Sequence, residues 1–195
     1  AVGPGIKLEV TRGGTLLELK EGEKNIRIRL LKEDGKSSTE RMVDRLRKEI
    51  NKENPDPILV VTTHENLAEV RKLIEGIEGK EKIEIYDTST SNIRKEALSE
   101  KVRNLKKGEI VITTEIGVRG LNAAYGTKLF FSEVHTLDLV NTLQALRRNN
   151  RYNQVTDKVY MFYSRATMDK FLKENKDLLK FMRARWESEF KQSPT

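Results

Sequence analysis

Three side chains between residues 144 and 151 have the types and spacing to bind a phosphate group. Gln144, Arg148 and Arg151 sit at i, i+4 and i+7, so on a helix they share one face. Guanidinium groups bind phosphate oxygens in bidentate fashion and do not lose their charge. The spacing therefore predicts a helix face that binds a polyanion. The alternative interpretation is a solvated, arginine-rich helix end that the helix dipole favours.

A glycine-flanked arginine forms a second candidate site. The segment from Gly117 to Gly120, with Arg119 between the two glycines, follows the short β-branched run from Ile110 to Ile112. Such a run predicts a strand that is buried on both faces. Loops just past the carboxyl ends of parallel strands are where open α/β sheets bind ligands. The presence of this loop favours a phosphate site over a solvated helix end.

Threonine pairs follow two of the predicted strands. Thr62 and Thr63 come after an apolar run that ends at Val61, and Thr113 and Thr114 follow the β-branched run described above. The carboxyl ends of parallel strands meet at one edge of a sheet, where ligands bind. We therefore expect these four threonines to be candidates for substrate contacts.

Two histidines also lie at expected strand ends. His64 could touch a ligand, although a lone loop histidine is more commonly only solvated. Glu133 and His135 could pair as an acid and a base, but the sequence supplies no nucleophile beside them. We do not expect that pair to be catalytic.

The composition predicts a folded domain with anionic partners. The chain has 195 residues, of which 36% are hydrophobic and 34% charged, and its net charge is +7. A chain of this length can bury a well-developed core, and the excess of positive charge favours nucleic acid, a nucleotide or an acidic membrane surface. The alternative is that most of the lysines cover ordinary exposed helix faces, because 30 acidic residues are interspersed with them.

Some classes of protein are disfavoured. There is no cysteine, so the chain has no disulfide, no thiol nucleophile and no cysteine metal site. No apolar run approaches the roughly 20 residues that span a bilayer, and no signal-peptide pattern is present. We expect a cytoplasmic location.

Alternation of strands and helices predicts the fold class. Strand-like runs lie at 25–31, 58–61, 82–86, 110–112, 128–131 and 158–163, with helical patterns between most of them. This order favours right-handed parallel βαβ units. We expect an α/β fold: a doubly wound, mostly parallel sheet of about six strands, flanked by helices.

Three regions are predicted along the chain. Residues 1–24 are interpreted as a cloning scar and a hairpin, because Gly13-Gly14 separates two alternating runs. Residues 25–165 form the α/β lobe. Residues 166–195 form a C-terminal helical segment, in which an apolar stripe from Met168 to Phe190 predicts one long helix.

Both candidate phosphate segments resemble conserved motifs of superfamily 2 helicases and translocases. Residues 112–123 are similar to the fifth motif, roughly A-T-x-x-x-x-R-G-x-D, and residues 144–151 are similar to the sixth, Q-x-x-G-R-x-G-R. The stretch that begins at Pro57 resembles the strand and helix that open the second RecA-like lobe, and Thr62 and Thr63 fall at its fourth motif. Within the superfamily the likeness is to SecA-type protein-translocase motors, and it covers residues 40–165.

This resemblance implies a role for each candidate residue. The chain would be the second RecA-like motor lobe, which closes over ATP and Mg²⁺ held by a preceding lobe and moves a polypeptide or a nucleic acid. A SecA-like motor would also be peripheral to the membrane. Arg148 and Arg151 would be catalytic and stabilise charge on the γ phosphate; the nucleotide-binding residues would be Gly117, Arg119, Gly120, Asn122 and Gln144.

The chain alone should not hydrolyse ATP. No G-x-x-x-x-G-K-[ST] phosphate loop is present, so ATP and Mg²⁺ are expected only with the missing first lobe. Arg147 and Asn150 replace the glycines of the sixth motif, and Asn122 replaces the aspartate of the fifth. These departures leave an alternative: a lobe without turnover that serves as a protein- or nucleic-acid-binding platform. A free-standing nucleic-acid-binding domain is a third interpretation.

Overall fold

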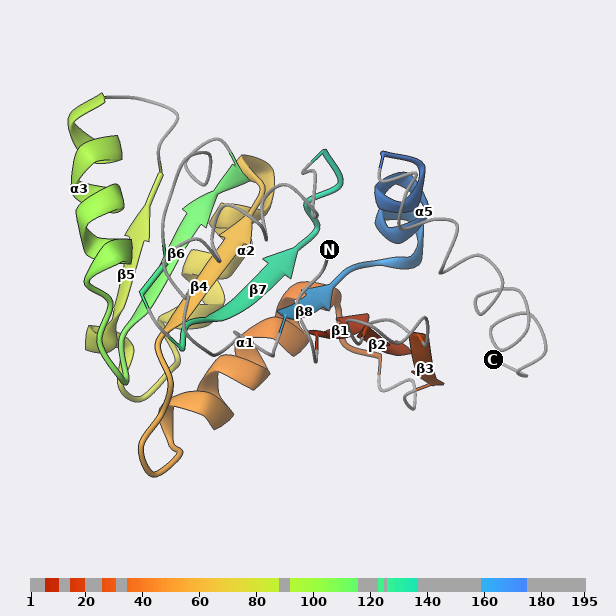
Figure 1. Ribbon diagram of the computed structural model, residues 1–195, viewed down its shortest axis with the longest axis horizontal. Coiled ribbons are helices and arrows are strands. Elements are labelled where there is room, and N and C mark those ends of the chain that lie inside the picture. The colour runs from red at the N-terminus through yellow and green to blue at the C-terminus, as the bar shows by residue number, and fades with distance from the viewer. Residues whose placement is uncertain are drawn as a thin grey trace.

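The computed structural model describes residues 6–10, 15–19, 26–30, 35–87, 92–115, 123–124, 126–136 and 159–174. Within these ranges the protein has an α/β fold with a parallel sheet at its centre (Figure 1). The strands of this sheet are β4 (Ile58–Thr62), β5 (Ile83–Tyr86), β6 (Ile110–Thr114), β7 (Lys128–Ser132) and β8 (Val159–Phe162). Their order is β5-β6-β4-β7-β8, and every neighbouring pair is parallel.

The predicted number of strands is wrong by one. The sequence predicted about six strands in the parallel sheet, and the described residues form five. The run expected at 25–31 is β3 (Ile26–Leu30), which pairs antiparallel with β2 (Thr15–Leu19), itself antiparallel to β1 (Ile6–Val10). Its apolar and polar residues alternate, as is typical of antiparallel strands with one wet face, whereas β4 and β6 at the centre of the parallel sheet are β-branched, apolar runs that end in threonine.

The three-stranded sheet lies beside the outer strand of the parallel sheet. β1 runs alongside β8 (Figure 1), so the first described residues of the chain and the last strand of the lobe are neighbours in space.

The helices are α1 (Ser38–Ile50), α2 (His64–Ile74), α3 (Asn92–Arg103) and α5 (Arg165–Glu174), with a 3-10 turn at Lys80–Lys82. The expected long C-terminal helix begins as α5, and the remainder of that prediction, beyond residue 174, lies outside the described residues. The N-cap of α1 is Ser37. Ser37 forms a capping box with Glu40, because its Oγ accepts from the Glu40 N–H at 3.1 Å and its N–H donates to the Glu40 carboxylate at 3.3 Å.

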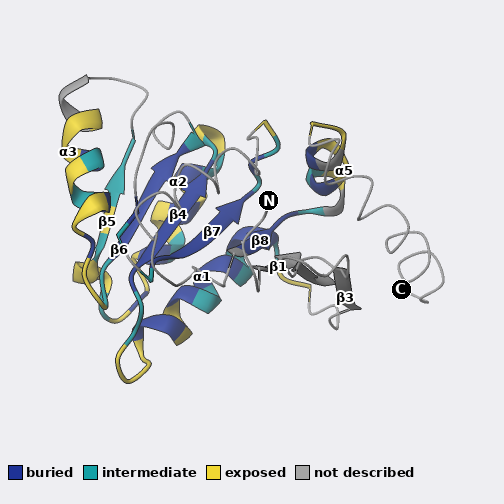
Figure 2. Ribbon diagram, in the orientation of Figure 1, coloured by how far each residue is buried: buried dark blue, intermediate teal, exposed yellow. Residues whose placement is uncertain are grey.

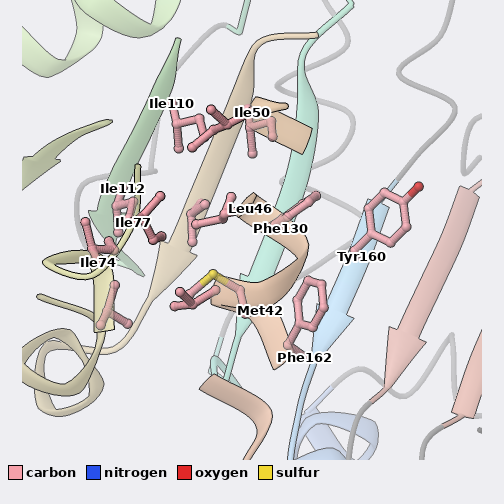
Figure 3. Close-up of a cluster of buried hydrophobic side chains, with 14 of the residues drawn as sticks. Met42, Leu46, Ile50, Ile74, Ile77, Ile110, Ile112, Phe130, Tyr160 and Phe162 are labelled. Carbon is pink, nitrogen blue, oxygen red and sulfur yellow. The ribbon is translucent and has the colours of Figure 1, made fainter. Parts of the chain in front are cut away.

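The core lies between α1, α2 and one face of the sheet. Met42 and Leu46 of α1 have no exposed surface and pack with the inward side chains of the central strands (Figure 3). Phe130, Tyr160 and Phe162 form an aromatic group beneath α1, with ring centroids 5.1–6.4 Å apart. On the other face the alternate strand residues are also buried (Figure 2): Leu59, Val61, Val111, Leu129, Phe131 and Met161. The inner strands β4, β6 and β7 are thus buried on both faces, whereas β5 at the edge is only partly buried.

An ion pair is buried at the amino edge of the sheet. Lys128, the first residue of β7, donates from Nζ to Glu49 of α1 at 2.7 Å, and their side chains are 4% and 0% exposed. Glu49 also accepts from Lys52 at 2.7 Å and from Arg45 at 3.2 Å. Burial by itself would raise the pKa of Glu49, but the hydrogen bonds from Lys128 and Lys52 outweigh it and hold the pKa below its ordinary value.

Candidate functional site at the carboxyl edge of the sheet

The parallel register brings both predicted threonine pairs to one edge of the sheet. Thr62 at the end of β4 is in register with Thr114 on one side and with Ser132 on the other. Thr113 is in register with Tyr86 of β5. The candidate substrate contacts therefore lie at the carboxyl edge, where the sequence placed them.

The strand order defines a topological switch point at this edge. From β4 the chain continues to β5 on one side of the sheet, and from β7 it continues to β8 on the other. Ligands of open α/β sheets bind in the crevice where successive connections diverge in this way. By that rule the crevice lies over the carboxyl ends of β4 and β7.

A hydrogen-bonded network joins the carboxyl ends of β4 and β7. The Asn66 side-chain amide, in the first turn of α2, donates to Thr62 Oγ1 at 3.0 Å and to Ser132 Oγ at 3.1 Å. Its Oδ1 accepts from Thr39 Oγ1 of α1 at 2.9 Å, and Thr62 Oγ1 donates to the Ser132 carbonyl at 3.2 Å. Thr39, Thr62 and Ser132 are almost fully buried. The network joins α1, α2, β4 and β7 in a rigid floor beneath the edge.

The hydroxyl groups of the two threonine pairs differ in their surroundings. Thr63 is the N-cap of α2, because its Oγ1 accepts from the Asn66 N–H at 3.1 Å. Thr113 is fully buried, and its Oγ1 has no hydrogen-bond partner. His135 Nδ1, after the end of β7, is a second buried atom without a partner. Orphaned polar atoms of this kind are uncommon in folded proteins, and both belong to segments at the carboxyl edge.

A histidine and a carboxylate span the end of β6. His64 Nδ1, after β4, lies 3.3 Å from Asp87 Oδ2, after β5, and β6 runs between these two strands. The His64 side chain is 62% exposed, so most of its surface faces water. The sequence indicated a solvated or ligand-touching histidine, but it did not indicate Asp87 as its partner. Only the strand order brings the two residues together.

Glu133 does not use its carboxylate on His135. It accepts from Ser38 Oγ and from the Ser164 backbone N–H, each at 2.5 Å, and from Ser164 Oγ at 3.2 Å. These contacts satisfy the carboxylate within the fold.

Burial and nearby negative charge both affect the pKa of Tyr163, which directly follows β8. Its ring is fully buried, and its hydroxyl donates to the Val134 carbonyl. Burial raises the pKa of Tyr163 well above its ordinary value, and the charges of Glu133 and Glu115 raise it further. Tyr163 therefore stays protonated and acts as a donor.

The predicted phosphate-binding residues fall outside the described part of the chain: Gly117, Arg119, Gly120, Asn122, Gln144, Arg148 and Arg151. The structure does describe β6, the strand that leads to Gly117. β6 ends at Thr114, beside β4 and at the carboxyl edge, and Glu115 is the last described residue before residue 123. Of the described residues, no cluster of three or more His, Asp or Glu side chains is arranged to hold a metal ion.

The fold and this edge define a class: an α/β protein with an all-parallel five-stranded sheet in its described part and polar side chains at the carboxyl ends of the strands. No protein-family model matches the chain, and no curated protein matches it either. In the described ranges, no helix is both long enough and apolar enough to cross a bilayer.

Proposed function

We propose that this chain is the second RecA-like motor lobe of an ATP-dependent superfamily 2 translocase or helicase of SecA type. One observation supports the proposal above the others. β6, which continues into the Gly117–Gly120 segment, ends at the carboxyl edge next to β4, whose last residue is Thr62. The two motif-bearing strands are thus central neighbours in a parallel sheet, as a motor lobe requires.

In this proposal the lobe supplies positive charge to ATP that a preceding lobe holds with Mg²⁺. Arg148 and Arg151 approach the γ phosphate and stabilise the charge that develops during its transfer, while Arg119 and Gln144 bind the nucleotide. The chain has no phosphate loop of its own, so it does not hydrolyse ATP alone.

The test is an ATPase measurement on the protein that contains both lobes. Because an arginine finger contributes about 10³–10⁵-fold to turnover, Arg148→Ala and Arg151→Ala should each abolish most of kcat while leaving ATP binding largely intact. Arg103→Ala, at the end of α3, is the matched control and should be silent. Turnover that is unchanged in both motif variants would exclude the arginine assignment.

A second candidate is a motor-like lobe that has lost turnover and binds protein or nucleic acid. Arg147 and Asn150 stand where the sixth motif has glycines, and both are larger than the turn after that helix normally accepts. This candidate predicts that the two-lobed protein lacks ATPase activity and that Arg147→Gly with Asn150→Gly restores some. If the partner is a nucleic acid, its affinity should fall steeply with salt concentration.

A further inference from the structure

One carboxylate holds the start of two helices. Ser38, which donates its hydroxyl to Glu133, is the first residue of α1, and Ser164, which donates both its N–H and its hydroxyl, directly precedes α5. A negative charge near a helix N-terminus is favourable because it opposes the positive end of the helix dipole. The negative charge of Glu133 lies near the N-termini of both α1 and α5.

The backbone at Glu133 is in an unusual conformation. Its φ is +59°, in the left-handed region that a side chain with a Cβ rarely adopts. Such a conformation persists only where the surrounding contacts hold it. The Glu133 N–H donates to the Phe162 carbonyl at 3.3 Å, so the loop after β7 is bonded to the end of β8 through both backbone and side chain. The strained residue is therefore the one that makes the connection.

Ser164 links Glu133 to the first turn of α5. Its hydroxyl accepts from the Thr167 N–H at 3.3 Å, and its carbonyl accepts from the Met168 N–H at 2.9 Å. Ser164 thus occupies the capping position of α5 while its own N–H and hydroxyl donate to Glu133. Loss of the carboxylate would release the cap as well as the loop.

α5 is held by both polar and apolar contacts. Of its described side chains, Met168 and Phe171 are buried, and the Phe171 ring meets Tyr163 edge-on at 5.5 Å. In Figure 1, α5 stands apart from α2 and α3, at the β8 end of the sheet. A helix of 10 residues has little stability of its own, so its polar attachment matters.

We propose that Glu133 is a clasp that fastens α5 to the first turn of α1, and that α5 opens as a unit, without unfolding of the parallel sheet, when this clasp is released. The two helix starts are then coupled, so that weakening either serine contact loosens the other helix. The clasp is a property of the chain by itself, and its test uses no nucleotide and no second lobe.

The test is residue-resolved amide hydrogen exchange on the full 195-residue chain. Glu133→Gln keeps the size of the side chain but removes its charge and one acceptor, and exchange of the Ser164 and α5 amides should become about tenfold faster or more. Glu133→Gly should do the same while relieving the left-handed backbone strain, so its sheet amides should stay protected. Equal acceleration in β4 and α5 in both variants would mean global unfolding and would overturn the proposal.

A milder variant, Ser164→Ala, tests the coupling and remains available if the Glu133 variants fail to fold, and Glu115→Ala is its control. Ser164→Ala removes one hydroxyl on the α5 side, and we expect about threefold faster exchange at the first-turn amides of α1 as well as in α5. Glu115→Ala removes a neighbouring carboxylate that accepts from Thr136, and it should leave both helices unchanged. An effect of Ser164→Ala that is confined to α5 would refute a shared clasp.

Discussion

Replacing Glu49 by glutamine should destabilise the fold strongly because it leaves the buried ammonium group of Lys128 with only the more distant Asp56 as a counterion. Lys128 is 4% exposed and cannot turn to water, and the next carboxylate, Asp56, lies 3.6 Å away and is 45% exposed. Removal of one partner from a buried ion pair costs about 3–5 kcal/mol. Lys52 and Arg45, the other cations of Glu49, are 48% and 30% exposed, so water can solvate them after Glu49 is replaced.

The assay is equilibrium unfolding in urea together with thermal melting. For a chain of this length, a loss of about 3–5 kcal/mol lowers Tm by roughly 6–20 °C. Lys128→Met should cost less, because Glu49 would keep Lys52 at 2.7 Å and Arg45 at 3.2 Å. The double variant should be more stable than the sum of the single changes by about 1–3 kcal/mol. If Glu49→Gln unfolds within about 1 kcal/mol of the parent protein, the buried pair is not the structural element described above.

The same pair gives the stability a defined pH dependence. The folded-state pKa of Glu49 lies below its ordinary value of 4.5, so the contribution of Glu49 is fully present above that value. It is lost as the pH falls from 4.5 through the lowered folded-state pKa, because protonation then favours the unfolded chain. The difference in stability between the parent protein and Glu49→Gln should therefore shrink in that acidic range and stay constant at neutral pH.

Two further predictions concern the β5 side of the molecule. Burial and the hydrogen bond to Glu84 raise the pKa of Tyr86 to about 12, so Glu84→Gln should lower the Tyr86 midpoint in an NMR titration of labelled tyrosines; an unchanged midpoint would contradict the role of Glu84. Gly79 has φ +90°, and a Cβ there would meet Ile50 Cγ2 at 3.0 Å, so Gly79→Ala should cost about 1–2 kcal/mol in urea unfolding. A neutral or stabilising effect of Gly79→Ala would show that this turn can relax.

Local patterns predicted the centre of the parallel sheet because its strands are short apolar runs. Ile58–Thr62 and Ile110–Thr114 are buried along their whole lengths, and their β-branched residues and short length favour a buried strand over a helix. The place of β3 was not predictable in the same way, since an alternating strand fits any sheet that offers one apolar face. β3 pairs with β2, the second strand of the hairpin that precedes it in the chain.

Long-range polar pairs were the part of the structure that the sequence could not predict. Glu49 and Lys128 are 79 residues apart, and Ser38 and Glu133 are 95 apart, so no spacing rule connects them. Glu133 was singled out as half of an acid–base pair, and its bonds to Ser38 and Ser164 follow from the sheet order and the left-handed backbone. The threonine pairs were placed at the correct edge because strand direction alone determines it.

β5 lies at the edge of the described parallel sheet, which affects how two molecules of this protein can associate. Of the strands that the structure describes, β5 has a partner only in β6, so one row of its backbone groups has no partner strand among them. Glu84 in the middle of β5 is exposed and pairs with Lys101 at 3.2 Å. A charged side chain in such a position makes the addition of a foreign strand unfavourable, because the charge would have to be desolvated. Substituting valine for Glu84 would remove this protection and promote aggregation through pairing of β5 edge strands from different molecules.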